Sequence, residues 1–509
     1  MRVLSITLLF FFTAVAAFSQ SRPILQTRGE MRIEDADDRI ITEKLLPAEN
    51  KLLIVGQKNI RLWDLATAKL LASRPIDVPD VTEDRPRIIS PNGLYMIVFG
   101  NYDARDKRNQ IKRPASIWNL ETGKQIAVFD KTTKPVRYAA WSKNGRTLVT
   151  SSDTIDQERI DADPIEISFW DGASFQYLNT VPADNIKWSY LSADGGKFFY
   201  SVAKVKTVII DKFLSDSEGP ISVWDIKTGK VAQTIFANAN DQKQEMRSIS
   251  ISPDERFLTY VTQPLKSKDV ERTLVVLSID RTSSNYAINR KYEIKPTPKI
   301  NDWSASFSPD GKYLALITGK VGYWSYAGGL VLQLYSTEAG FKIAELTKHY
   351  APGFWLNDDR VLLFEYGVRL EAVEVPAGRK LYESKLIYNS SQITKTHTRP
   401  SASFPGLTDR HTEYMGWVVH DETKIVPHIN GRMFLTYSNQ YVKVYDAQTG
   451  AVLQTLVEPA VDTSKPEDPK KGPRLSQVPL VSKADWSSDG NTLYIVSADK
   501  KSVSFWSMN

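Results

Sequence analysis

The chain has 509 residues, of which 42% are hydrophobic and 24% charged, and its formal net charge is +6. This composition is ordinary for a globular protein with a large apolar core. Lys and Arg are interspersed with acids and form no basic stripe, so the charge does not indicate a nucleic-acid partner. Cys is absent, which excludes disulfides, thiolate nucleophiles and cysteine metal sites.

The chain begins with a segment typical of an export signal, "MRVLSITLLFFFTAVAAFSQ". One early Arg precedes an apolar run, and Ala17 and Ser19 stand at the −3 and −1 positions of a cut before Gln20. A membrane anchor is the alternative, but the run is short and has no basic flank. The sequence predicts a signal peptide over 1–19 and a secreted or periplasmic mature protein, and the absence of Cys favours a bacterial source.

The rest of the chain repeats one short pattern. The stretch "ISVWDIKTGKVAQTI" (221–235) is typical of two strands joined by a tight turn, and variants occur at 60–72, 115–129 and 442–456. Before each copy stands a turn such as "SPDG" (308–311), followed by another run of β-branched and aromatic residues. Four such strands make a twisted sheet that is apolar on both faces. Sheets of this kind are stable when stacked around an axis, so the sequence predicts an all-β propeller over 20–509.

The motifs "LWDL", "IWNL", "FWDG" and "VWDI", several of them ahead of "TGK", resemble those of WD-repeat propellers. The resemblance covers most of 30–509 and is nearest to bacterial exported propellers with loose "SPDG" repeats. It implies four-stranded antiparallel blades around a central channel. The Gly-His pair that usually opens a WD repeat is missing throughout, so the hydrogen-bond network of that family is not expected.

Nine units can be counted, and eight blades with one irregular unit are the alternative. The unit in question is the seventh, at 360–384, whose third strand lacks the Trp found at that position in other units. The last unit (479–509) supplies only three strands. Residues 24–33 are therefore predicted to provide the fourth strand and to close the ring, which removes two open sheet edges.

The units differ in length at fixed places. Long segments fall between the second and third predicted strands at 101–114, 152–166, 203–220, 263–272 and 319–330, and between units at 385–425 and 457–475. These connections are expected on one face and the tight turns on the other. Repeat proteins commonly collect insertions on the binding face, and binding residues concentrate on loops of rigid scaffolds. The sequence thus predicts one decorated working face.

Aromatic and charged loop residues are the candidates for binding on that face. Tyr323, Trp324 and Tyr326 are the expected anchor, because Tyr and Trp dominate binding energy at interfaces. Solvated spacer loops, with the aromatics packed on a neighbouring loop, are the alternative. A basic sector is expected beside an acidic one, formed respectively by Arg105, Lys107, Arg108, Lys112 and Arg113 and by Asp153, Asp156, Glu158, Asp161 and Asp163.

Other conspicuous residues have structural explanations. The bulky residues at the ends of third strands, such as Trp170, are expected in the core, and the Asp after several of them is expected to cap a turn. Four of the five His residues fall in one stretch, at spacings that match no metal-ligand pattern, so solvated loop histidines and no metal are predicted. These are His397, His411, His420 and His428.

No nucleophile elbow, phosphate loop or dinucleotide fingerprint is present. The sequence therefore predicts an exported, non-catalytic and monomeric propeller that binds a protein, peptide or glycan. No cofactor, nucleic acid or membrane span is predicted. A lactonase-like propeller hydrolase or lyase with a small-molecule site at the central channel stays open as the alternative, since acids from several blades can converge there without a sequence motif.

Overall fold

The computed structural model describes residues 24–35, 38–76, 87–102, 111–152, 166–182, 186–203, 218–235, 244–264, 273–281, 287–295, 302–319, 331–347, 351–356, 361–365, 369–377, 379–385, 392–400, 408–417, 424–458 and 479–508. The predicted signal peptide lies outside these residues. Within them the regular structure is strand, apart from one 3₁₀ turn, η1 (Pro47–Glu49). The same ranges contain no helix long and apolar enough to cross a bilayer.

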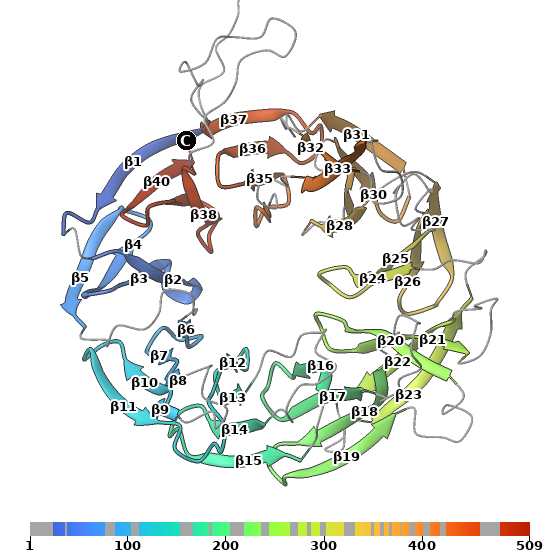
Figure 1. Cartoon of the computed structure of the whole chain (residues 1–509), viewed down its shortest axis with the longest axis horizontal. Coiled ribbons are helices and arrows are strands. Elements are labelled where there is room, and N and C mark those ends of the chain that lie inside the picture. Colours follow the sequence, from blue (N-terminus) through green and yellow to red (C-terminus); the bar gives the residue numbers. More distant parts are fainter. Residues whose placement is uncertain are drawn as a thin grey trace, which may run out of the picture.

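The strands form nine four-stranded antiparallel units arranged in a ring, here called blades one to nine (Figure 1). Blades one to three consist of β2 (Ile40–Leu46), β3 (Lys51–Gly56), β4 (Asn59–Asp64) and β5 (Lys69–Pro75); β6 (Ile88–Ile89), β7 (Tyr95–Val98), β10 (Ser116–Asn119) and β11 (Lys124–Val128); and β12 (Tyr138–Trp141), β13 (Thr147–Ser151), β14 (Ile167–Asp171) and β15 (Tyr177–Val181).

Blades four to six consist of β16 (Ile186–Leu191), β17 (Lys197–Ala203), β18 (Glu218–Asp225) and β19 (Lys230–Ile235); β20 (Gln244–Ile251), β21 (Phe257–Pro264), β22 (Thr273–Asp280) and β23 (Ala287–Ile294); and β24 (Asp302–Phe307), β25 (Tyr313–Gly319), β26 (Val331–Ser336) and β27 (Lys342–Thr347). One pairing, Glu218 opposite Met246, joins blades four and five into a continuous sheet.

Blades seven to nine consist of β28 (Ala351–Trp355), β29 (Val361–Glu365), β30 (Arg369–Glu374) and β31 (Arg379–Lys385); β34 (Lys424–Pro427), β35 (Met433–Tyr437), β36 (Val442–Asp446) and β37 (Val452–Val457); and β38 (Val481–Trp486), β39 (Thr492–Ser497), β40 (Ser502–Met508) and β1 (Leu25–Arg32). The seventh unit builds a complete blade without its Trp, so the count of nine is confirmed. Two further hairpins pair only within themselves in the described chain: β8 (Asn101–Tyr102) with β9 (Ile111–Arg113), and β32 (Gln392–Pro400) with β33 (Thr408–Trp417).

The second strand of each blade explains why the blades must stack. In β3, Leu53 and Val55 pack toward blade two, whereas Leu52 and Ile54 pack toward blade nine. Such a strand is apolar at nearly every position because both of its faces are buried. Burying one Leu, Ile or Val side chain contributes about 1.5–3 kcal/mol, and a blade on its own would leave both of its faces exposed.

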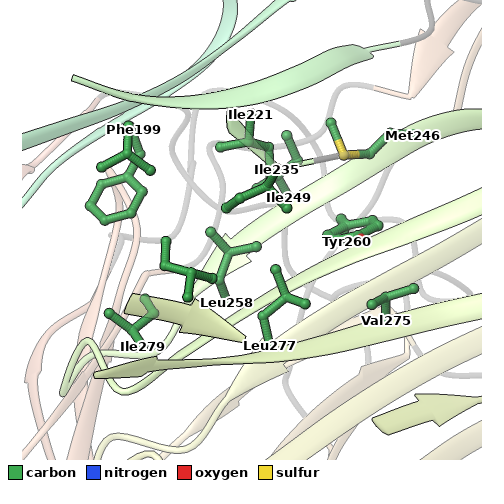
Figure 2. Packing of buried hydrophobic residues seen from close by; sticks show 12 residues of the cluster. Phe199, Ile221, Ile235, Met246, Ile249, Leu258, Tyr260, Val275, Leu277 and Ile279 are labelled. Carbon is green, nitrogen blue, oxygen red and sulfur yellow. The ribbon is translucent and has the colours of Figure 1, made fainter. Parts of the chain in front are cut away.

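Each junction between neighbouring blades has its own apolar cluster. Between blades four and five, Phe199, Ile221 and Val223 meet Leu258 and Leu277 (Figure 2). Similar clusters lie at the other eight junctions, including the one between blades nine and one. The core of the protein is therefore a ring of nine interfaces.

Blade nine takes its outermost strand from the beginning of the described chain. β1 pairs antiparallel with β40, from Leu25 opposite Met508 to Arg32 opposite Ser502. The Gln454 side chain of blade eight holds the start of β1, because it accepts a hydrogen bond from Leu25 N at 2.9 Å and donates one to Leu25 O at 3.0 Å. This pairing confirms the strand predicted to close the ring.

Candidate functional site

The five predicted insertions occur at the same step of consecutive blades. Each connects the second and third strands of blades two, three, four, five and six. We call the side on which these connections emerge the loop face, and the side of the first-to-second and third-to-fourth turns the turn face. Arg105, Lys107, Arg108, the anchor residues Tyr323, Trp324 and Tyr326, and the acidic sector 153–163 lie outside the described residues.

Part of one insertion is described. Lys112 and Arg113 belong to β9, and Arg113 is the cross-strand partner of Asn101 in β8. The segment 101–114 therefore starts and ends as a paired hairpin, although the sequence predicted it only as an insertion.

The turn face is built from one repeated device. In the turn before β25, the Ser308 hydroxyl donates to Asp310 Oδ1 at 2.7 Å and accepts from the backbone N–H of Tyr313 at 2.9 Å. Gly311 completes this turn with a φ of +74°. The same bonds are made by Ser90, Ser142, Ser192, Ser252 and Ser487. The repeated Ser is thus a buried residue whose side chain stabilises the turn through these two bonds.

The repeated Asp and Trp residues are structural, as predicted. Asp171 accepts bonds from the backbone N–H groups of Ala173 and Ser174 at 3.1 and 2.7 Å. These bonds outweigh desolvation and lower the pKa of its carboxyl. Trp170 is 2% exposed, and its indole N–H donates to Thr150 Oγ1 at 2.9 Å. Asp64, Asp225 and Asp446 cap their turns in the same way.

The prediction of four solvated loop histidines is wrong for His428. This residue is buried at the position that Ser occupies in six of the other turns. Its Nδ1 accepts from Asn430 N at 3.1 Å, its Nε2 donates to Gly490 O at 2.8 Å, and its ring packs edge-on against Trp486. His397 and His411 belong to the hairpin of β32 and β33, and His420 lies outside the described residues.

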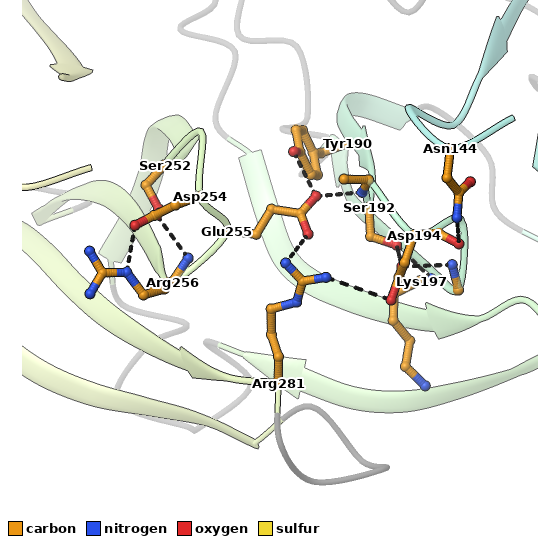
Figure 3. A network of polar contacts seen from close by, with 12 residues as sticks. Asn144, Tyr190, Ser192, Asp194, Lys197, Ser252, Asp254, Glu255, Arg256 and Arg281 are labelled. Carbon is orange, nitrogen blue, oxygen red and sulfur yellow. Dashed lines mark hydrogen bonds and ion pairs between the residues drawn. The ribbon is translucent and has the colours of Figure 1, made fainter. Parts of the chain in front are cut away.

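A polar network crosses the turn face between blades four and five (Figure 3). Glu255 has a φ of +57°, in the place where most of the other turns have Gly. Its buried carboxylate accepts from the Tyr190 hydroxyl at 2.9 Å and from the backbone N–H of Ala193, and pairs with Arg281 Nη1 at 2.9 Å. The sequence analysis missed this link, although Glu in place of Gly in "SPDERF" was the available signal.

A second group of charges lies at the seam between blades nine and one, on the innermost strands β38 and β2 (Figure 1). Lys483 Nζ lies 3.1 Å from Glu43 Oε1 and 3.9 Å from Asp485 Oδ2. Asp485 remains 31% exposed, yet burial raises the pKa of its carboxyl, and Glu43 adds to the effect. Burial also raises the pKa of the neighbouring Tyr494 phenol. Sequence reasoning missed this group because it joins residues from the two ends of the chain.

Comparison with known proteins supports the repeat type. Residues 123–155 match the family model "WD domain, G-beta repeat". In this structure they include β11, β12 and β13, the outer strand of one blade and the first two strands of the next. No curated protein matches the chain.

Two solved structures align with most of the chain. The C-terminal WD40 domain of Sif2 aligns with a TM-score of 0.41 at 11% identity, covering 96% of this chain and 99% of that one. A eukaryotic initiation factor aligns with a TM-score of 0.49 at 11% identity, covering 84% and 91%. The strand pairing shows that the chain is a β-propeller, and one stretch of it is similar to the WD domain, G-beta repeat.

Proposed function

We propose that the protein is an exported, non-catalytic interaction scaffold that binds a protein, peptide or glycan through its loop face. The observation that carries this proposal is the shared position of the five insertions, which lengthen five consecutive blades at the second-to-third strand step. A rigid ring that presents neighbouring loops on one side can build a continuous binding surface.

The contrast between the two faces supports this choice. Polar groups on the turn face are already engaged with each other. The repeated Ser side chains bond to the backbone of their turns, and Glu255 and Arg281 of blade five contact Tyr190 and Asp194 of blade four. A surface whose hydrogen-bonding groups are satisfied internally has fewer groups to offer a partner. The lengthened segments, in contrast, carry the aromatic and charged residues of 101–114, 152–166 and 319–330.

Trp324 is the proposed anchor, and site-specific crosslinking tests it. A photoreactive amino acid at position 324 should capture a discrete partner from the native envelope or medium. The same photoreactive amino acid at position 341 is the control, because Phe341 is a 61% exposed aromatic in the third-to-fourth connection of blade six, on the turn face. With the captured partner, Trp324→Ala should weaken binding by about thirtyfold or more, the size expected for a hot spot of at least ~2 kcal/mol. Equal affinity of Trp324→Ala and Phe341→Ala for the partner would show that Trp324 is not the anchor.

Export is a separate part of the proposal. The composition of 1–19 supports cleavage before Gln20. N-terminal sequencing of the protein from its native source should begin at or near Gln20, in a soluble exported fraction. Met1 at the N-terminus of a membrane-bound form would contradict this part alone.

The group of charges at the seam between blades nine and one favours a second candidate function, that of a hydrolase or lyase acting at the central channel. Asp485 is a partly exposed carboxyl with a raised pKa, which is typical of a general acid. Within the described residues, however, no group of three or more His, Cys, Asp or Glu is arranged to hold a metal. If this candidate is correct, turnover found with a panel of lactones should disappear in Asp485→Asn; unchanged turnover would exclude Asp485.

A further inference from the structure

The charges at the seam between blades nine and one belong to two different blades. Glu43 lies on β2 of blade one, whereas Lys483 and Asp485 lie on β38 of blade nine. Both strands are the innermost of their blades, so the group lies beside the central channel (Figure 1). Any movement of blade nine away from blade one therefore separates Glu43 from the other two residues.

Two carboxylates share one cation in this group. Lys483 Nζ lies 3.1 Å from Glu43 Oε1 but 3.9 Å from Asp485 Oδ2. Lys483 therefore compensates the charge of Glu43 more fully than that of Asp485. The backbone N–H of Trp486 donates to Asp485 Oδ1 at 2.9 Å, which does not remove the repulsion between the two carboxylates. An ionised Asp485 is thus only partly compensated.

Two buried tyrosines lie next to Asp485. Tyr494 of β39 is its direct cross-strand partner, and Tyr437 comes from β35 of blade eight. Both phenols are uncharged at neutral pH, because burial raises the pKa of each, that of Tyr437 to about 12. The surroundings of Asp485 therefore disfavour its charge. Burial first, and then the neighbouring Glu43, raise the pKa of the Asp485 carboxyl.

We propose that ionisation of Asp485 loosens the seam between blades nine and one, so that closure of the ring depends on pH. Opening the seam returns Asp485 to water and moves Glu43 away with blade one, which relieves both the desolvation and the repulsion. A protonated Asp485 gains neither from opening. Lys483 then pairs with Glu43 alone, across the seam, and holds the two blades together.

The direction of the pH dependence follows from the raised pKa. A carboxyl whose pKa is raised by folding favours the closed form most at acidic pH, below the ordinary Asp value of about 3.9. That contribution is lost as the pH rises through the raised value of the folded protein. The seam should thus open more readily at neutral than at acidic pH. This proposal concerns closure, so it and the candidate hydrolase can fail separately.

Thiol labelling of single-Cys variants tests the proposal, because the natural chain has no Cys. Val496→Cys places a thiol in the buried cluster between blades nine and one, and Val223→Cys places one between blades four and five as the reference. The ratio of the two labelling rates cancels the pH dependence of thiol chemistry. We expect this ratio to rise at least about fivefold from pH ~5 to pH ~8. Val503→Cys, in the same seam cluster, is a second reporter should Val496→Cys fail to fold.

Asp485→Asn in the single-Cys background should abolish the rise, because Asn resembles the protonated carboxyl in shape and does not ionise. Asp489→Asn is the matched control from the same blade. The Asp489 carboxylate accepts from Ser487 Oγ at 2.6 Å and Asn491 N at 3.0 Å, and its pKa is lowered, so its loss should leave the rise unchanged. A ratio that stays constant with pH, or a rise that persists in Asp485→Asn, would overturn the proposal.

Discussion

Asp38 is a fully buried carboxylate in the connection between β1 and β2. It accepts hydrogen bonds from Lys58 N at 2.9 Å, Asn59 Nδ2 at 3.2 Å and Arg61 Nη2 at 2.7 Å. Burial alone would raise the pKa of this carboxyl, but the three donors and the Arg61 charge outweigh burial and lower it. The charge therefore stabilises the fold at the point where the chain passes from the last blade to the first.

Asp38→Asn should lower the free energy of unfolding by about 2–4 kcal/mol at pH 7, because it leaves the largely buried Arg61 guanidinium without its counter-ion. A carboxyl whose pKa is lowered by folding stabilises the protein above its unfolded pKa of about 3.9. That contribution is lost as the pH falls through the lowered folded value. Urea unfolding at several pH values should therefore show the difference between wild type and variant shrinking below pH ~4.

The exposed pair of Arg32 and Glu30 is the control for this experiment. Glu30→Gln should change stability by less than about 1 kcal/mol, since an exposed ion pair is screened by solvent. An Asp38→Asn variant as mildly affected as Glu30→Gln would contradict the role given to Asp38.

Glu255 and Ala68 both have a positive φ at positions where related turns have Gly. Left-handed backbone costs a non-Gly residue about 1–2 kcal/mol. Ala68→Gly removes that strain and should raise stability by up to ~1 kcal/mol. Glu255→Gly removes the same strain but also the bonds to Tyr190, Ala193 and Arg281, so it should lower stability by about 1–2 kcal/mol. Thermal melts of the two variants should shift in opposite directions; a stabilised Glu255→Gly protein would show that the link is not needed.

At the scale of single elements, the sequence predicted most of the fold. The hairpins around Trp63, Trp118, Trp224 and Tyr445 follow from local chemistry, because a capping Asp or Asn and a turn residue with positive φ act within a few positions. The closing strand could be predicted because its partner blade lacked one.

The features that the sequence did not reveal depend on contacts between distant residues. His428 is buried because Gly490, from the next blade, accepts its Nε2–H. The group of Glu43, Lys483 and Asp485 exists only because the ring closes. The hairpin of β32 and β33 is an exception, since it is local, and it was not predicted because its alternation of polar residues has no apolar face to identify it.

Removal of residues 20–33 should destabilise the whole protein. It deletes β1, which exposes the edge of β40 and removes Leu25 from the cluster between blades eight and nine and Met31 from the cluster between blades nine and one. We expect the melting temperature to fall by more than about 10 °C, because several buried apolar side chains are lost together. Gln454→Ala, which removes only the two bonds to Leu25, should have a smaller effect in the same direction. A truncated protein that melts within a degree or two of the full mature chain would contradict the closing role.

At the scale of the whole molecule, the ring has no terminal repeat. A linear repeat array has two end units with one unpacked face each, whereas here every blade is covered on both sides. The nine junctions are therefore equivalent in kind, and stability does not depend on where the backbone begins. The chain passes from the outermost strand β1 of blade nine to β2 of blade one as it does at other junctions, and blade nine differs in that β1 pairs with β40 from the opposite end of the described chain.

A circular permutant tests this equivalence. Leu25 lies opposite Met508, so a short linker can join these ends, and the chain can be reopened within 459–478, between blades eight and nine. We expect the permutant to fold with cooperative unfolding and strand content similar to the wild type in circular dichroism. A permutant reopened between Leu52 and Leu53, inside the buried strand β3, is the control that should fail. Failure of both would show that the original seam is essential.

The pairing of β1 with β40 also has a consequence for assembly. The two strands belong to one blade but are separated by nearly the whole chain, so a molecule that has folded its other blades still has an unpaired β40 edge. At high concentration that edge can accept β1 from another molecule with the same register, which gives strand-exchanged dimers without any new interface. Refolding should therefore yield monomer at low protein concentration and an increasing share of slowly reverting dimer as the concentration rises.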